Sequence, residues 1–236
     1  MEIKGAIDFS LADWDGKTSS VFFLPNCNFR CPFCHNSTLV LYPEKEETIP
    51  FERVENYLKK QRDWIDGVCI TGGEPTLHSD LQEFCSKLKK MDFLVKVDTN
   101  GTNPRMVEKL IEGGLIDYVA MDIKAPLTVE KYSKAIGVNA GKFLDKVKEN
   151  VGILLESKID YEFRTTIVPT LHKREDVEEI CQDLRGCKKY VLQKFDVSLG
   201  KETLDPEFSK LKPFTDEKMR KFLTVAKNFL SNTKLR

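Results

Sequence analysis

The chain alternates between two hydrophobic periods from residue 18 onward. Six short apolar runs predict buried strands, at residues 19–24, 67–71, 93–98, 117–123, 161–168 and 189–195. Between them, apolar residues recur every three or four positions, as in the segment with Leu81, Phe84, Cys85 and Leu88 on one face. Parallel strands need long and usually helical crossovers. The alternation therefore predicts an α/β fold with a parallel sheet.

Residues typical of helix ends support several of these boundaries. Pro50 opens a helix, and Asn103 and Pro104 stand as the N-cap and first residue of another. Gly113 closes that helix, and Thr215 caps the last one.

Polar and cysteine motifs lie at the end of each predicted strand or just past it. They are residues 27–36, 71–75, 98–101, 121–126, 164–166 and Gln193. Six βα repeats fit either an open doubly wound sheet or an incomplete barrel, but in a barrel the strand ends converge on one mouth. We therefore expect a partial (β/α)6 TIM-like barrel of parallel strands with outer helices. We expect a single domain over 1–236, with a core at about 18–195, an N-terminal lead-in at 1–17 and a C-terminal helical extension at 200–236.

Composition narrows the function classes. Lys+Arg and Asp+Glu both number 37 in 236 residues, so there is no basic footprint of a nucleic-acid binder. Acidic residues interrupt the apolar N-terminal stretch, which excludes a signal peptide. No run approaches the roughly 18 apolar residues of a membrane span. We expect a cytoplasmic protein with neither a nucleic acid nor a membrane as partner.

Three of the seven cysteines, Cys27, Cys31 and Cys34, have the spacing C-x3-C-x2-C. Three thiolates suit a [4Fe-4S] cluster whose fourth iron stays open to a small molecule. The alternative is zinc with His35 as fourth ligand, although Cys34 and His35 are adjacent and would struggle to reach one tetrahedral ion. The other four cysteines are scattered, and we expect Cys69 and Cys85 to be buried structural thiols.

The sequence GGEP, residues Gly72, Gly73, Glu74 and Pro75, follows the second strand without a phosphate-loop pattern. Paired glycines allow positive φ and close backbone approach to a ligand, and strand-edge carbonyls there could hold an ammonium group. A tight turn before the next helix is the alternative.

Asp98, Asp122 and Lys124 follow two neighbouring strands. Two acids and a base suit a zwitterionic amino acid, with a monovalent cation between the acids and its carboxylate. An ion-pair network bracing the rim is the alternative. A buried Arg164 needs an anionic partner, either a ligand group or a rim acid. We expect His78 and His172 at the surface, and the alternative for His172 is that it lines the mouth of the barrel.

The cysteine spacing, with Phe33 before the third cysteine and GGEP one strand later, resembles the radical S-adenosylmethionine superfamily. The resemblance spans about residues 5–195 and implies a partial (β/α)6 barrel. It implies a [4Fe-4S] cluster on Cys27, Cys31 and Cys34, and S-adenosylmethionine that is reductively cleaved to methionine and a 5′-deoxyadenosyl radical. Further implied cofactor contacts are the backbone at Gly72, Gly73, Glu74 and Pro75 with the methionine amino group, Phe33 and His35 with adenine, and Asp98, Asn100, Asp122, Lys124 and Arg164 around the carboxylate and ribose.

The lead-in IDFSLADWDG, CHN after the third cysteine, and DTNG and MDIKAP are similar to the glycyl-radical-enzyme activases. Within them, the sequence is most similar to those serving anaerobic ribonucleoside-triphosphate reductase. This implies that reductase as partner, with a flavodoxin- or ferredoxin-like electron donor. Asn26 departs from the family, which usually has glycine there. A pyruvate formate-lyase-type activase, a radical enzyme acting on a small molecule or nucleoside, and an electron-transfer module without catalysis are the alternatives.

Overall fold

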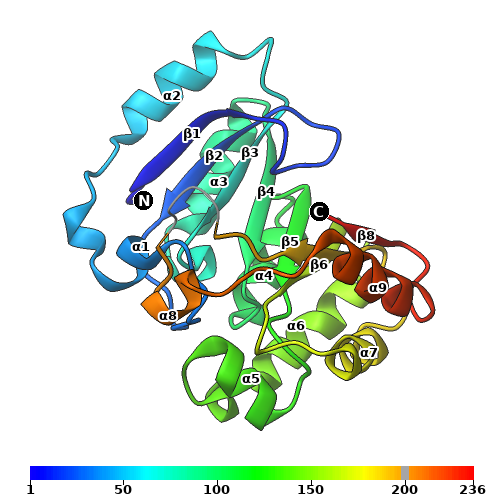
Figure 1. Cartoon of the computed structure of the whole chain (residues 1–236). Helices are drawn as coiled ribbons and strands as arrows, with labels where there is room; N and C mark the ends of the chain where they lie inside the picture. The colour runs from blue at the N-terminus through cyan, green and yellow to red at the C-terminus, as the bar shows by residue number, and fades with distance from the viewer. Residues whose placement is uncertain (198–201) are drawn as a thin grey trace. The chain divides into compact units, whose positions relative to one another are not determined.

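The computed structural model describes residues 1–197 and 202–236 and has one eight-stranded sheet with its strands in chain order, β1 to β8 (Figure 1). The strands are β1 (Gly5–Ser10), β2 (Ser19–Leu24), β3 (Gly67–Gly72), β4 (Leu94–Thr99), β5 (Tyr118–Asp122), β6 (Asp160–Ile167), β7 (Tyr190–Lys194) and β8 (Thr233–Leu235). The six predicted strands are β2 to β7, each within one residue of its predicted ends. The predicted α/β fold is confirmed, and the mostly parallel sheet is consistent with a partial TIM-like barrel.

Helices connect most of the strands. They are α1 (Ser37–Leu41), α2 (Phe51–Lys60), α3 (Leu81–Lys90), α4 (Pro104–Glu112), α5 (Val129–Ile136), α6 (Leu144–Glu156), α7 (Arg174–Asp183), α8 (Pro206–Ser209) and α9 (Asp216–Lys227), with short 3-10 turns at Pro43–Lys45, Pro75–Leu77 and Ala140–Lys142. The predicted caps are confirmed, since the Asn103 side chain accepts the Met106 amide and the Thr215 side chain accepts the Lys218 amide. No helix in these described ranges is both long and apolar enough to cross a bilayer.

The chain packs into two compact units. The first comprises Met1–Asn28, Thr38–Thr99 and Asn103–Ala120, and the second Phe29–Ser37, Asn100–Thr102 and Met121–Arg236. The prediction that residues 1–236 form one domain stays a prediction.

In the first unit, β2 pairs in parallel with β3, and β3 with β4, so that Val21, Cys69 and Lys96 lie in register. Trp14, Val21 and Cys69 form a buried cluster. The predicted apolar face of α3, which includes Cys85, is buried as well. Cys69 and Cys85 are both confirmed as buried thiols.

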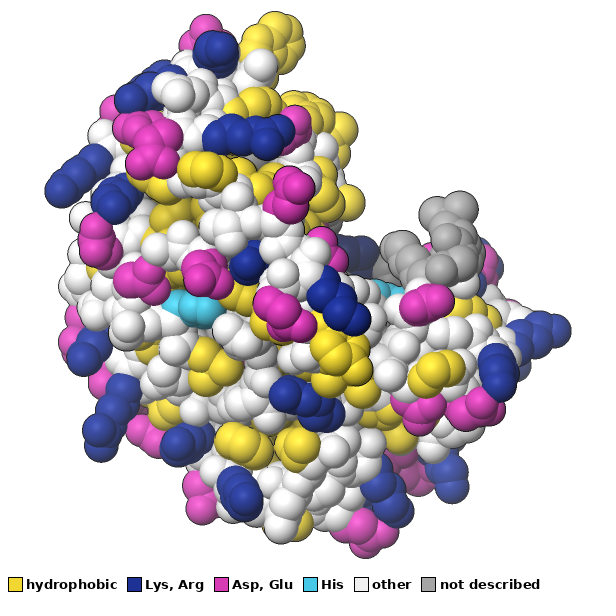
Figure 2. Space-filling view, turned by 90° about the vertical axis from the view of Figure 1, so that its left-hand side faces the viewer, with side chains coloured by type: hydrophobic (Ala, Val, Ile, Leu, Met, Phe, Trp, Pro, Cys, Tyr) yellow, Lys and Arg dark blue, Asp and Glu magenta, His cyan; other side chains and the backbone are white. Residues whose placement is uncertain are grey.

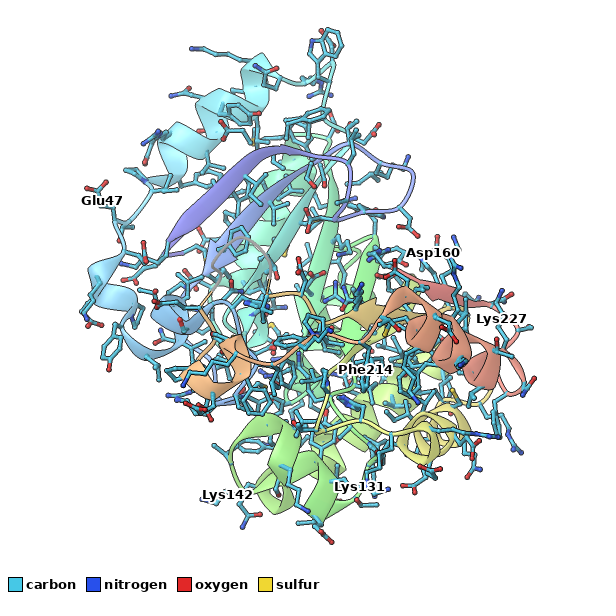
Figure 3. All side chains as sticks on the ribbon, viewed as in Figure 1. Glu47, Lys131, Lys142, Asp160, Phe214 and Lys227 are labelled. Atoms are coloured by element: carbon cyan, nitrogen blue, oxygen red, sulfur yellow. The ribbon has the colours of Figure 1, made fainter. Side chains whose placement is uncertain are left out.

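In the second unit, β6, β7 and β8 pair in parallel, with Tyr190 in register between Phe163 and Thr233. Lys131, labelled in Figure 3, projects from α5 and bonds two acids of α7, Asp176 at 2.9 Å and Glu179 at 2.8 Å. These ion pairs fix one outer helix against another.

Two strands were not predicted. β1 lies in the predicted lead-in and pairs antiparallel with β2, with a register shift between Ile7 and Ser10. Residues Ala6 to Phe9 are exposed on both faces, so they lack the alternation that marks a strand. β8 lies in the predicted helical extension, of which residues 200 and 201 fall outside the described residues, and its three residues are too few to show a period.

Candidate functional site

The turn after β3 is held to the end of β2 by backbone hydrogen bonds within the first unit. The Gly73 amide donates to the Leu24 carbonyl at 2.8 Å, and the Glu74 amide donates to the Asn26 carbonyl at 2.7 Å. Gly72 has a φ of 118°, a conformation that favours glycine. A Cβ on Gly73 would lie 1.8 Å from the Asn26 carbonyl oxygen. Both glycines are therefore required by the turn itself.

Asn26, the departure from the family pattern, keeps the conformation that glycine would adopt. Its φ is 65°, in the left-handed region that asparagine tolerates better than most residues. Its amide donates to the Leu39 carbonyl at 2.9 Å. His78, expected at the surface, is half-buried, and its Nε2 lies 2.8 Å from the Pro25 carbonyl oxygen. The His78 ring N–H therefore donates to the Pro25 carbonyl and adds a side-chain hydrogen bond that stabilises the same turn.

The Glu74 side chain points inward and bonds the protein. It is 1% exposed, and its Oε1 accepts the Thr76 amide at 3.0 Å and the Thr99 hydroxyl at 2.7 Å. Pro75 begins the short 3-10 turn that presents Thr76. The Glu74 carboxylate thus joins the turn after β3 to the end of β4, and Thr99 is a supporting residue that the sequence analysis missed.

Asp98 lies one residue before the end of the same strand and has a partner that was not predicted from the sequence. Its Oδ1 accepts a hydrogen bond from the Lys96 ammonium at 2.5 Å. Lys96 stands two positions earlier, so both side chains project from one face of β4. The sequence signal that could have revealed this ion pair is a lysine inside an apolar run.

The cysteine loop of the second unit is tied to the C-terminal segment. The Leu204 amide donates to the Cys34 carbonyl at 2.9 Å, and the Asp205 amide donates to the Pro32 carbonyl at 3.0 Å. Within the loop, the Cys34 amide donates to the Cys31 carbonyl at 3.0 Å. Cys31 is buried and Cys34 is half-buried. Backbone bonds therefore fix the loop without using either sulfur atom.

Burial controls the protonation of the Cys34 thiol. It raises the pKa of Cys34, and the opposing effects of the Asn36 amide and the Lys124 ammonium are smaller. Cys27 belongs to the first unit, where its thiol is half-buried. Among the residues described here, no three or more histidine, cysteine or acidic side chains are grouped to hold a single metal ion.

Two aromatic contacts surround the predicted adenine residues. The exposed His35 ring stacks on the buried Phe195 ring, with centroids 5.9 Å apart and planes at 15°. The Phe33 ring is buried, and the Lys124 ammonium lies 5.9 Å from its centroid. His35 thus presents a flat face already backed by a second ring. Contact of Phe33 and His35 with adenine stays a prediction.

Asp122, Lys124 and Arg164 form an ion-pair trio in the second unit. Asp122 accepts from Arg164 Nε through Oδ1 and from the Lys124 ammonium through Oδ2, both at 2.9 Å. The rim acid predicted as one partner for Arg164 is therefore Asp122. Although burial alone would raise the pKa of Asp122, Arg164 and Lys124 outweigh it and lower that pKa from 3.8 to about 2.

Asp122→Asn is expected to remove a pH-dependent part of the stability of the apo-protein. Because the folded pKa is depressed, the stabilisation is present above the unfolded value of 3.8 and is lost as pH falls toward about 2. The difference corresponds to about 2 kcal/mol. In urea unfolding, the free-energy gap between wild type and variant should be widest above pH 5 and should narrow by that amount at pH 2. A gap independent of pH would contradict this origin.

His172 corrects the expectation of a surface residue, since it is 2% exposed. Its Nδ1 accepts the Val168 amide at 3.0 Å, so Nε2 carries the hydrogen and donates to the Lys124 carbonyl at 2.9 Å. Burial lowers the pKa of His172, which favours this neutral ring. The sequence missed this role because the partners are backbone groups, and the ring fixes the segment that carries Lys124.

The turn after β4 is shaped by its own side chains. Asn100 Oδ1 accepts the Thr102 amide at 3.0 Å and the Thr102 hydroxyl at 2.7 Å. Asn150 donates from α6 to the Gly101 carbonyl at 3.2 Å. The role predicted for Asn100 at the cofactor stays a prediction.

Comparison with known proteins identifies the class. The family model described as "Radical SAM superfamily" matches residues 21–185, and the chain belongs to this superfamily. A Methanocaldococcus jannaschii protein named "Putative glycyl-radical enzyme activating enzyme" is 33% identical over 235 residues, covering 99% of this chain and 95% of that protein.

More distant relatives share part of their length with the chain. A Helicobacter pylori protein named "GTP 3',8-cyclase" is 27% identical over 156 residues, covering 64% of this chain but 47% of the relative. The crystal structure of Streptococcus suis SuiB superimposes with a TM-score of 0.70 at 16% identity, over 92% of this chain and 48% of that one. SuiB has also been solved with S-adenosylmethionine bound. This likeness shows the fold alone.

The residues of the second unit fit the cluster that the superfamily implies. Although burial alone would lower the pKa of Lys124, the Asp122 carboxylate raises it, so this ammonium is a stable positive charge. The negative charge that Cys31 and Cys34 would carry as cluster ligands acts in the same direction. A fixed cation that acts on both thiols suits a group rich in anionic sulfur.

Proposed function

We propose that this protein is an activase that makes a glycyl radical on a partner enzyme. The observation that carries the proposal is the 33% identity, over 99% of this chain and 95% of the relative, with the M. jannaschii protein of that name. The lead-in motif favours anaerobic ribonucleoside-triphosphate reductase as the partner, and a flavodoxin- or ferredoxin-like protein as the electron donor. Cys27, Cys31 and Cys34 would hold the cluster, which together with S-adenosylmethionine supplies a 5′-deoxyadenosyl radical for hydrogen abstraction from glycine.

The ion-pair trio gives a physical basis for orienting the cofactor. Both Asp122 oxygens accept hydrogen bonds from Lys124 and Arg164, which fixes these two cations, and the methionine carboxylate would bind beside the Lys124 ammonium. The methionine ammonium would bind at the backbone of residues 72–75. His35, backed by Phe195, would stack on adenine.

Exposed apolar side chains on β1 support a protein as the substrate. Figure 2 shows hydrophobic side chains at the surface of the face that carries α2 and β1. Ile7 is 43% exposed and Phe9 50%, both on β1, and Leu11 just after it is 70% exposed. Apolar side chains gathered on a surface mark interaction sites more often than single ones do. A partner protein would cover them, whereas a small substrate would not.

The test combines anaerobically reconstituted protein, dithionite, S-adenosylmethionine and the candidate reductase. We expect 5′-deoxyadenosine together with a glycyl-radical signal in electron paramagnetic resonance, and no signal when the radical glycine of the reductase is replaced by alanine. Cofactor cleavage with no signal on the reductase, and none on a pyruvate formate-lyase-type enzyme, would refute the activase function. No cleavage at all would refute catalysis.

A radical enzyme acting on a nucleotide is the second candidate, favoured by the similarity to GTP 3',8-cyclases. The same reconstitution with GTP in place of the reductase distinguishes the two. Consumption of GTP together with cofactor cleavage would support this candidate over the first.

A further inference from the structure

Lys96 is a buried cation in the first unit that none of the roles above uses. It lies in the middle of β4, in register with Cys69 of β3, and its side chain is 1% exposed. Its ammonium bonds Asp98 Oδ1 at 2.5 Å, and the Asp98 side chain is 12% exposed. A lysine is almost never buried this completely without a strong reason, because its charge must be desolvated.

The ammonium retains donors that this single bond does not use. A lysine ammonium has three N–H donors, and among the described residues Asp98 is the one acceptor that Lys96 bonds. The nearby Cys69 thiol is no competing anion, because burial raises its pKa to about 12. Buried donors without acceptors are costly. Lys96 and Asp98 together therefore present a neutral pair with donors left over for an anionic ligand group.

The Lys96–Asp98 pair affects whether the Asp98 carboxylate can lie next to the carboxylate of S-adenosylmethionine. Two carboxylates repel each other unless a positive charge lies with them, and the sequence analysis expected a monovalent metal cation near Asp98 and Asp122. Each acid already has cations from the chain itself, Asp98 from Lys96 and Asp122 from Lys124 and Arg164. At Asp98, the positive charge that an added metal ion would contribute is thus already supplied by the Lys96 side chain.

We propose that Lys96 is a built-in cation that replaces a monovalent metal ion in S-adenosylmethionine binding. It neutralises Asp98 and offers its remaining N–H donors to the cofactor's carboxylate. Lys96 is thus a binding residue, and the cofactor binds equally well with or without potassium or sodium. The proposal rests on the cofactor use of the superfamily and on the placement of Asp98 at the cofactor. It does not depend on which glycine or nucleotide the radical attacks.

The test measures the dissociation constant of S-adenosylmethionine on the reconstituted holoenzyme, by anaerobic calorimetry. Buffers contain potassium, sodium or tetramethylammonium, which is too large to replace a metal ion. Wild type should give the same constant in all three. Lys96→Met should bind at least about tenfold more weakly in tetramethylammonium, equivalent to 1.4 kcal/mol, and potassium or sodium should restore most of the loss. Lys96→Arg, which keeps the charge, should remain independent of the metal.

Controls separate this role from a structural one. Lys89→Met removes a lysine that also bonds an acid in the first unit, Asp117 at 2.7 Å, and should show no cation dependence. If Lys96→Met fails to fold, Lys96→Met/Asp98→Asn removes the pair without leaving a buried charge, and it should bind weakly with no response to potassium.

Three results would overturn the proposal. One is wild-type binding that needs potassium or sodium. Another is weakened Lys96→Met binding that neither ion restores, and the third is unchanged Lys96→Met binding in tetramethylammonium. Because the readout is cofactor binding, such a failure leaves the glycyl-radical experiment informative.

Discussion

Gly73→Ala should destabilise the protein by roughly 3 kcal/mol and sharply weaken S-adenosylmethionine binding. The added Cβ would lie 1.8 Å from the Asn26 carbonyl oxygen and 2.5 Å from its carbon. These are backbone atoms, so no rotamer change relieves the clash. The turn must move away from Asn26, which breaks the 2.7 Å bond from the Glu74 amide. Urea unfolding of the apo-protein and calorimetry on the holoenzyme measure the two effects.

Gly152→Ala is the matched control, because Gly152 lies inside α6 and a Cβ there meets nothing within 4 Å. It should stabilise the protein by up to about 1 kcal/mol, since alanine favours helix more than glycine does. If Gly73→Ala and Gly152→Ala had the same free energy of unfolding, the close approach of Gly73 to Asn26 would not constrain the turn.

Cys34→Ala should abolish cluster binding and lower 5′-deoxyadenosine formation by more than roughly 100-fold, since even outer-shell changes at metal sites cost 10- to 100-fold. The loop itself should persist, because the bonds to Leu204 and from the Cys34 amide use backbone atoms. Iron and sulfide analysis, visible absorbance and product assay measure the loss, and circular dichroism checks the fold.

Cys187→Ala removes a cysteine outside the motif and is the matched control. Cys187 is half-buried, and burial raises its pKa to about 11, so it stays a neutral thiol. Its iron content and product formation should match wild type. Full iron loading of Cys34→Ala would show that the thiol at position 34 is no ligand.

The sequence predicted the parallel strands because each is a mostly apolar run followed by a turn or cap signal, as at Asn103. The candidate site residues could be proposed because polar and cysteine side chains recur at the strand ends or just past them. It did not predict β1, whose exposed residues alternate weakly, or β8, which is too short.

The hydrogen-bond partners of buried polar side chains were the other feature that the sequence did not predict. Lys96 and Asp98 are two residues apart, so their bond was accessible once a charge in a buried strand was noticed. The bond between His172 and the Lys124 carbonyl spans 48 residues and leaves no pattern, because any residue offers a carbonyl. The spacing of hydrophobic residues predicts helices and strands, whereas the partners of buried polar groups depend on tertiary contacts.

The bonds from Leu204 and Asp205 to the cysteine loop set an order for biosynthesis. The loop at residues 27–36 leaves the ribosome well before its backbone partners, Leu204 and Asp205, have been made. A nascent chain therefore carries the cysteines on a segment that has not reached its final form. Iron–sulfur delivery to the completed chain would find the loop shaped, and a truncation before residue 204 would leave it without these two restraints even though every cysteine was present.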